Sequence, residues 1–272
     1  MAEPAVSGPM QLPATWSATA VGYAEEIVPF MVPYAEKALS MVALGQQNHI
    51  LDVATGPGTL AFLVAPRVSR VIAIDFAPGM VDQVGARAAR DGVSNVESAV
   101  MDAQALSFPD AFFHAAFCMF GLMFFPDRAR AIGELRRVLR PGGQALIATW
   151  GPIERRPLMK LGFEAMAEAL PQVPAPRKGD WQHPDECVRE MTEAGFKQVT
   201  AQLFTASIRA DSPEHYLRIM ARSGAPFVAL QKKLGDEAWA EAEARLLDAV
   251  GRRMPAGGAD LPAEAILTVG TR

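Results

Sequence analysis

Short apolar segments alternate with amphipathic ones from His49 to Trp150, and this rhythm constrains the fold more than any other feature of the chain. The apolar segments have the length and composition of buried strands: 49–53, 71–74, 96–100, 113–119 and 144–150. The segments between them have helical spacing or helix-end residues: 59–66, 79–90 and 127–139. Strands that alternate with helices predict a Rossmann-like, doubly wound α/β fold with a mostly parallel sheet.

The regular alternation ends after Trp150. Two further strands are expected at 196–209 and 262–270, which would bring the sheet to seven strands. The segments 151–185 and 212–258 are predicted to be helical insertions that form a lid over the carboxyl edge of the sheet. We expect one domain over 1–272. Its core would be 45–150, preceded by helices over 16–44 that Pro29 and Pro33 break in two.

A carboxylate and two glycines follow the first strand, in the run Asp52-Val53-Ala54-Thr55-Gly56-Pro57-Gly58. Residues without a Cβ allow the backbone to pass close to a ligand, and the N-terminus of the next helix offers unpaired N–H groups. A strand-to-helix turn can need a glycine for its geometry alone, so the run by itself leaves a purely structural role open.

Two more acids end the second and third strands. Asp75 could accept hydrogen bonds from both hydroxyls of a ribose, or it could cap the helix that starts near Pro78. Capping explains it less well, because a cap directly precedes the first helical residue and Phe76 and Ala77 intervene. Asp102 could accept an adenine amino group, with a simple turn aspartate as the alternative. Acids at the ends of three consecutive strands converge on the crevice where open α/β sheets bind ligands.

Several segments of the chain resemble class I S-adenosylmethionine-dependent methyltransferases. The resemblance is greatest to the subgroup of the ubiquinone and menaquinone C-methyltransferases. The matching segments are Leu51 to Gly58, Ile74 to Met80, Met101 to Asp110, Glu134 to Gly143 and Ala194 to Phe196. One departure is Ala54, which stands where the family most often has a glycine.

The resemblance implies that S-adenosylmethionine is the cofactor. The implied cofactor residues are Tyr23, Asp52, Ala54, Gly56, Gly58, Asp75, Phe76, Met80, Asp102, Ala103, Met119 and Phe120. In this scheme the two glycines approach the methionyl part and Asp75 holds the ribose. Phe76 and Met80 pack on the adenine, whose edge meets Asp102 and Ala103. Met119 and Phe120 line the sulfonium and substrate side. Tyr23 closes over the amino-acid end, unless it is an ordinary half-buried helix tyrosine.

No catalytic group stands out from the sequence. His183, His215 and Tyr34 are weak candidates for a general base toward an oxygen or nitrogen acceptor, while His49 and His114 are expected to be structural. The two cysteines, Cys118 and Cys187, form no CxxC pair, and no metal site is expected.

We expect methyl transfer to a small, lipophilic or aromatic metabolite at carbon or oxygen. The lid residues that suggest such an acceptor are Trp181, Leu217, Ile219, Met220 and Phe227. The net charge of −4 gives no reason to expect a nucleic-acid partner. No secretory signal or membrane span is recognisable, so a cytoplasmic location is expected, with a homodimer left open.

Other functions stay open at this point. A nicotinamide-dependent oxidoreductase also uses a Gly-rich turn, and Ala61 stands where its last small residue belongs. In that reading, however, the first glycine of the turn would be Gly56, which comes four residues after the acid Asp52 at the end of the strand. The turn of nicotinamide-dependent enzymes does not normally have such an acid. The sequence does not separate methyl transfer from other chemistry on the same cofactor, or from a binding protein that has lost its acceptor pocket.

Overall fold

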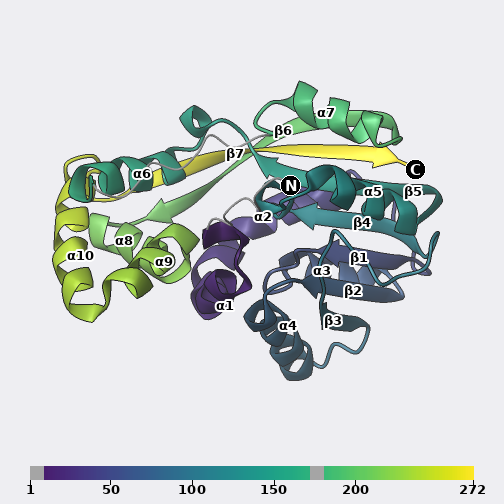
Figure 1. The fold of residues 1–272 in the computed structure, drawn as a ribbon, viewed down its shortest axis with the longest axis horizontal. Helices are drawn as coiled ribbons and strands as arrows, with labels where there is room; N and C mark the ends of the chain where they lie inside the picture. The colour runs from purple at the N-terminus through teal and green to yellow at the C-terminus, as the bar shows by residue number, and fades with distance from the viewer. Residues whose placement is uncertain (1–8, 172–180) are drawn as a thin grey trace, which may run out of the picture.

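The computed structural model describes residues 9–171 and 181–272 and is built on a seven-stranded sheet in the order β3-β2-β1-β4-β5-β7-β6 (Figure 1). The strands are β1 (His49–Val53), β2 (Arg70–Asp75), β3 (Val96–Val100), β4 (Phe113–Met119), β5 (Leu139–Trp150), β6 (Lys197–Ala210) and β7 (Ala259–Thr271). The strands β1 to β5 pair in parallel, whereas β7 is antiparallel to both β5 and β6. The predicted mostly parallel, seven-stranded α/β fold is therefore confirmed.

Helices cover both faces of the parallel strands. On one face lie α2 (Val28–Ser40), α3 (Thr59–Val64) and α4 (Pro78–Asp91), and on the other lie α5 (Arg128–Val138) and α7 (Pro184–Glu193). Successive side chains of a strand point to opposite faces. In β1, Ile50 accordingly enters one hydrophobic core, while Leu51 and Val53 enter the other. Such double burial explains why these strands are apolar throughout rather than alternating.

The N-terminal helices do not break where the sequence predicted. The helix α1 (Pro13–Gly22) runs through a π-helical turn, Tyr23–Ile27, directly into α2. Pro29 lies in the first turn of α2, next to the π-helical turn, and Pro33 lies inside the helix. The prediction that Pro33 ends a helix is thus wrong, because the buried face of α2, which includes Phe30 and Tyr34, holds the helix together.

The strands β6 and β7 extend well beyond the parallel strands. Pairing of β5 with β7 ends at Trp150 and Ala265, but β6 and β7 stay paired as far as Ala210 and Ala259. On this extension lie α6 (Pro157–Ala169), α8 (Pro213–Ser223), α9 (Ala225–Leu234) and α10 (Asp236–Gly251) (Figure 1). The helix α1 contacts α4 on one side and both α8 and α9 on the other.

None of the helices in the described parts of the chain has both the length and the apolar character that a bilayer span requires. Within the same residues, no group of three or more His, Cys, Asp or Glu side chains is arranged to hold a metal ion.

Candidate functional site

A cavity of about 560 Å³ lies at the carboxyl ends of β1, β2, β3 and β4. All but one of the cofactor residues expected from the sequence line it: Tyr23, Asp52, Ala54, Gly56, Asp75, Phe76, Met80, Asp102, Ala103, Met119 and Phe120. The strand ends thus bring together residues that are far apart in the chain, as parallel strands joined by helices do.

Gly58 is the exception and does not line the cavity. It is the N-cap of α3 and has a φ of 82°, a left-handed conformation that L side chains rarely adopt. A Cβ at this position would lie 2.8 Å from the ring of Phe62. Its observed role is therefore to form the turn and to admit Phe62, rather than to approach a ligand.

Asp52 is a buried acid at the end of β1, with 1% of its surface exposed. The Thr55 hydroxyl donates a hydrogen bond to Oδ2 at 2.6 Å, and Oδ1 has no hydrogen-bond partner among the described residues. Burial raises the pKa of Asp52 to about 7, an effect that the Thr55 bond partly offsets. A buried carboxylate with an unused acceptor favours a cation on the cavity side.

Asp75 ties the first turn to the end of β2. Its Oδ2 accepts a hydrogen bond from the N–H of Gly56 at 3.0 Å, and its Oδ1 accepts one from the N–H of Ala77 at 2.9 Å. Burial raises the pKa of this carboxyl, and the two backbone donors lower it. Ala77, not Asp75, occupies the N-cap position of α4. The interpretation that capping does not explain this acid is confirmed.

Asp102 and Ala103 follow β3, the acid exposed and the alanine buried. The backbone N–H and the side-chain Nε2 of Gln104 both donate to Asp102 Oδ1, at 2.8 and 3.1 Å. Gln104 itself lines the cavity. The sequence analysis did not identify it.

Phe76 and Met80 form an apolar side of the cavity together with Tyr23, packed around Ala20 and Ala77. Burial and, to a smaller extent, the charge of Asp75 together raise the pKa of Tyr23 to about 12. The Tyr23 phenol is therefore neutral and within electrostatic reach of Asp75. It lies at the start of the π-helical turn, a distortion that often marks functional positions.

The segment after β4 contributes Met119 and Phe120. Phe120 has a φ of 62°, although it is not a glycine, and its N–H donates to the carbonyl of Ala148 at 2.9 Å. Its ring stacks on Trp150 with centroids 4.0 Å apart and meets Tyr34 edge-on. The surrounding rings stabilise a backbone conformation that costs about 1 kcal/mol or more for such a residue.

The N-terminal helices form the wall opposite the strand ends. Trp16 of α1 and Met31 of α2 line the cavity, and the Trp16 ring lies 5.1 Å from that of Phe124. The sequence analysis missed Trp16. A usable signal was its spacing from Tyr23, because residues seven apart lie on the same face of a helix.

The two insertions are helical, as predicted, but their described residues do not form a lid over the cavity. No described residue of 151–185 or 212–258 lines the cavity, while 172–180 lie outside the described residues. The expected lid side chains are instead buried in the hydrophobic cores: Trp181, Leu217, Ile219, Met220 and Phe227. They pack the extended part of the sheet and its neighbours, and α1 takes the position over the cavity.

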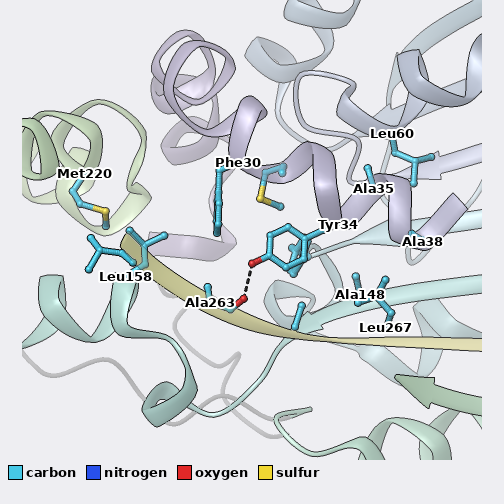
Figure 2. Packing of buried hydrophobic residues seen from close by; sticks show 14 of the residues in the cluster. Phe30, Tyr34, Ala35, Ala38, Leu60, Ala148, Leu158, Met220, Ala263 and Leu267 are labelled. Carbon is cyan, nitrogen blue, oxygen red and sulfur yellow. Dashed lines mark hydrogen bonds between the residues drawn. The ribbon is translucent and has the colours of Figure 1, made fainter. Parts of the chain in front are cut away.

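None of the three catalytic candidates lines the cavity. Tyr34 is fully buried, and its hydroxyl donates to the carbonyl of Ala263 at 2.5 Å, joining α2 to β7 (Figure 2). Burial raises its pKa to about 12. His183 is exposed just before α7, and His215 Nδ1 accepts from the N–H of Asp211 at 3.1 Å. A base role for these residues finds no support in their positions.

The ionisable side chains that line the cavity, among the described residues, are Tyr23, Asp52, Asp75 and Asp102. No lysine, arginine or histidine of the described chain joins them there. The cavity therefore carries negative charge at its strand-end rim and favours a ligand with positive charge.

The profile of the methyltransferase domain family matches residues 50–143. An uncharacterized protein of Mycobacterium tuberculosis is 35% identical over 127 residues, which are 47% of this chain and 45% of that protein. A demethylmenaquinone methyltransferase of Clavibacter sepedonicus is 30% identical over 179 residues, which are 60% of this chain and 71% of that enzyme. The chain thus spans less than half of the first relative and most of the second.

Among solved structures, the YcgJ protein of Bacillus subtilis is similar with a TM-score of 0.58, at 18% identity and over 88% of this chain and 97% of that one. A likeness at this level of identity supports the fold. Together with the cavity residues and the Clavibacter enzyme, these similarities show that the chain belongs to the family of class I S-adenosylmethionine-dependent methyltransferases.

Proposed function

We propose that the chain transfers a methyl group from S-adenosylmethionine to a small, largely apolar acceptor, at carbon or at oxygen. The observation that carries this proposal is the composition of the cavity. One rim bears Asp52, Asp75 and Asp102, and the opposite wall is formed by side chains such as Trp16 and Phe124. A polar, anionic end and an aromatic end suit a cationic nucleoside and an apolar partner, respectively.

The residues at the rim fit the cofactor. Gly56 has a φ of 54°, and a Cβ placed there would meet no protein atom within 4 Å, so its backbone faces open space. Asp75 would accept from the ribose hydroxyls and Asp102 from the adenine amino group. Asp52 lines the cavity next to Gly56, where its carboxylate would suit the ammonium of the methionyl tail. When bound, S-adenosylmethionine supplies a methyl group activated by a sulfonium cation, and aromatic faces such as Phe120 attract such a cation.

The opposite wall supports an uncharged acceptor. It includes Met31, Ala35 and Phe125 besides Trp16 and Phe124, and no described histidine, cysteine, lysine or glutamate lies on the cavity. Among the described residues on the cavity, the ionisable groups are therefore Tyr23 and the three carboxyls that we assign to the cofactor, and none is left over as a general base for the acceptor. An acceptor that is already nucleophilic, such as an ionised phenol or enol, needs none. The name of the Clavibacter relative, a demethylmenaquinone methyltransferase, supports an aromatic acceptor of this kind.

The nicotinamide alternative is poorly supported by the same cavity. Dinucleotide cofactors carry a pyrophosphate beside the first turn, and its charge is unfavourable next to the buried carboxyl of Asp52 without a cationic side chain among the described residues. Other chemistry on S-adenosylmethionine uses the same rim and is distinguished only by its products.

The test is incubation of the full chain with a metabolite extract and S-adenosylmethionine labelled in its methyl group. Mass spectrometry then identifies labelled products. We expect one or a few apolar products that are absent with the Asp75→Asn variant. Calorimetry with S-adenosylhomocysteine accompanies this assay. Failure of the wild-type protein to bind it at high micromolar concentration would contradict the proposal, and binding without any labelled product would point to other chemistry.

A further inference from the structure

Gln104 connects two loops that border the cavity. On one side, its backbone N–H and its Nε2 both donate to Asp102 Oδ1, at 2.8 and 3.1 Å. On the other side, its Oε1 accepts a hydrogen bond from the backbone N–H of Asp127 at 2.8 Å. Asp102 follows β3, and Asp127 is the N-cap of α5. One half-buried side chain thus joins the rim after β3 to the rim before α5.

The orientation of the Gln104 amide is determined by its partners. The N–H of Asp127 can only donate, so it requires the amide oxygen. An ionised carboxylate can only accept, so Asp102 requires the amide nitrogen. A flipped amide would lose both hydrogen bonds. Asp127 is itself held in place, because its carboxylate accepts a hydrogen bond from the N–H of Arg130 at 2.9 Å as the cap of α5.

This arrangement restricts Asp102. An exposed aspartate in a loop otherwise samples several rotamers, and a ligand that needs one of them must bear the entropic cost of ordering it. Both bonds from Gln104 end on Oδ1, so Oδ2 receives none from it. The carboxylate is therefore oriented before any ligand binds, with one oxygen engaged and the other left as an acceptor at the cavity.

We propose that Gln104 is a positioning residue that sets the nucleobase preference of the site by holding Asp102 as an acceptor. This inference rests on the proposed function. Adenine presents an amino donor where hypoxanthine presents a carbonyl, so a fixed carboxylate favours adenine. If Asp102 is free to rotate away, the penalty against the carbonyl is smaller and the two bases bind more equally.

The experiment compares the affinity of the full chain for S-adenosylhomocysteine with that for S-inosylhomocysteine, by titration calorimetry. For the wild-type protein we expect a preference for adenine of about tenfold or more, the scale of one hydrogen bond to a charged group. Gln104→Leu keeps the backbone N–H bond to Asp102 Oδ1 and loses the Nε2 bond and the bond to Asp127, so the preference should fall about threefold, mainly through weaker binding of the adenine ligand. Gln104→Glu keeps the acceptor for Asp127 but loses the donor to Asp102, and should show the same direction.

Two controls separate positioning from general damage. Gln144→Leu removes a comparable bond, from the N–H of Ala43 to the Gln144 side chain at 2.9 Å, away from the cavity. It should leave the adenine preference unchanged. Asp102→Asn should abolish the preference, and adding Gln104→Leu to it should change nothing further. A general loss of stability weakens both ligands together and leaves their ratio intact.

An unchanged ratio in both Gln104 variants would overturn the inference, as would equal binding of the two ligands by the wild-type protein. In the second case the proposed function survives, because the chain still binds the cofactor product. If the wild-type protein binds neither ligand, the proposed function and the inference fail together.

Discussion

The two walls of the cavity are built in different ways. At the strand ends, hydrogen bonds between side chain and backbone fix each polar group, as Asp75 shows with its bonds from Gly56 and Ala77. On the opposite side, α1 is held by helix packing and by the N–H of Gly79, which donates to the Ser17 hydroxyl at 3.1 Å, while ion pairs hold the π-helical turn that follows it. Those pairs join Glu26 to Arg218 and Arg222 of α8.

This difference indicates a division of labour. The strand-end wall loses several buried hydrogen bonds if it moves, so it suits an invariant ligand such as the cofactor. The helical wall depends on partly exposed ion pairs and on contacts between rings, which cost less to rearrange. It suits the entry and exit of an acceptor and product.

The largest effect is expected at the strand-end wall. Asp75→Asn removes a buried charge and places an NH₂ group against one of two backbone donors. We expect the affinity for S-adenosylhomocysteine to fall about 100-fold, the scale of lost hydrogen bonds to a charged group. Calorimetry measures it, with Asp260→Asn, which changes an exposed side chain of β7, as the matched control. A loss of less than about threefold would show that this wall tolerates change as the other does.

The second effect concerns the stability of the ligand-free protein. The pKa of Asp52 is about 7 when folded and near 3.8 when unfolded, so the folded state binds the proton more tightly. The resulting stabilisation is complete below about pH 4 and is lost as the pH rises through 7. Between pH 5.5 and 7 the wild-type protein should lose about 2 kcal/mol of unfolding free energy, a loss that Asp52→Asn should not show.

Urea unfolding at several pH values measures this difference, and Asp260→Asn should follow the wild-type curve. Saturating S-adenosylhomocysteine should flatten the wild-type dependence, because a bound ammonium stabilises the ionised carboxylate. Parallel curves for the wild-type protein and Asp52→Asn would mean that Asp52 does not titrate in this range.

The third prediction compares two half-buried phenylalanines. Phe124 lines the cavity against Trp16, whereas Phe163 lies in α6, away from the cavity, and packs against the hydrophobic core. Phe124→Ala should slow the initial rate of label transfer about tenfold, because an apolar contact with the acceptor is lost. Phe163→Ala should lower the unfolding free energy and leave the rate unchanged. Equal losses of rate in the two variants would contradict the prediction that side chains of the cavity wall contact the acceptor and those of the insertions do not.

The smallest effect is expected at the opposite, amino edge of the sheet. His114 Nδ1 accepts from the N–H of His49 at 2.9 Å, and burial and the neighbouring Arg140 lower the pKa of His114. A lowered pKa favours the neutral ring, so this stabilisation is present above pH 6.5 and is lost as the pH falls below it. Since the ring is partly solvated, the loss should stay below about 1 kcal/mol.

His114→Gln keeps an acceptor but cannot titrate, so its unfolding free energy should change less between pH 6.5 and 5.5 than that of the wild-type protein. The unfolding free energy thus changes with pH in the opposite direction to the contribution of Asp52. A steeper pH dependence of the unfolding free energy in His114→Gln than in the wild-type protein would contradict this prediction.

The strand-end wall could be predicted from the sequence because the parallel strands themselves gather its residues. Once the strands are located, Asp52, Asp75 and Asp102 must share one edge. The positive φ of Phe120 could not be predicted, since it depends on rings that come from Tyr34 and Trp150, far along the chain.

The place of the helical insertions relative to the cavity could not be predicted for a similar reason. The apolar faces of α8 and α9 are visible in the sequence, but their partner is not. Burial of Leu217 and Phe227 depends on how far β6 and β7 extend beyond β5. The hydrophobic pattern of the sequence does not determine the length over which two such strands stay paired. The position of α1 over the cavity follows from that extension, because α8 and α9 support it.

The contact at Gly22 joins α1, which lies over the cavity, to α8, which packs on the extension of the sheet. A Cβ at this position would overlap the carbonyl oxygen of Arg222, so α1 and α8 touch backbone to backbone. A methyl group added at Gly22 would push α1 away from α8 and tilt the helix that carries Trp16. The packing of α8 against Gly22 therefore sets the tilt of α1 and, through it, the position of Trp16 at the cavity.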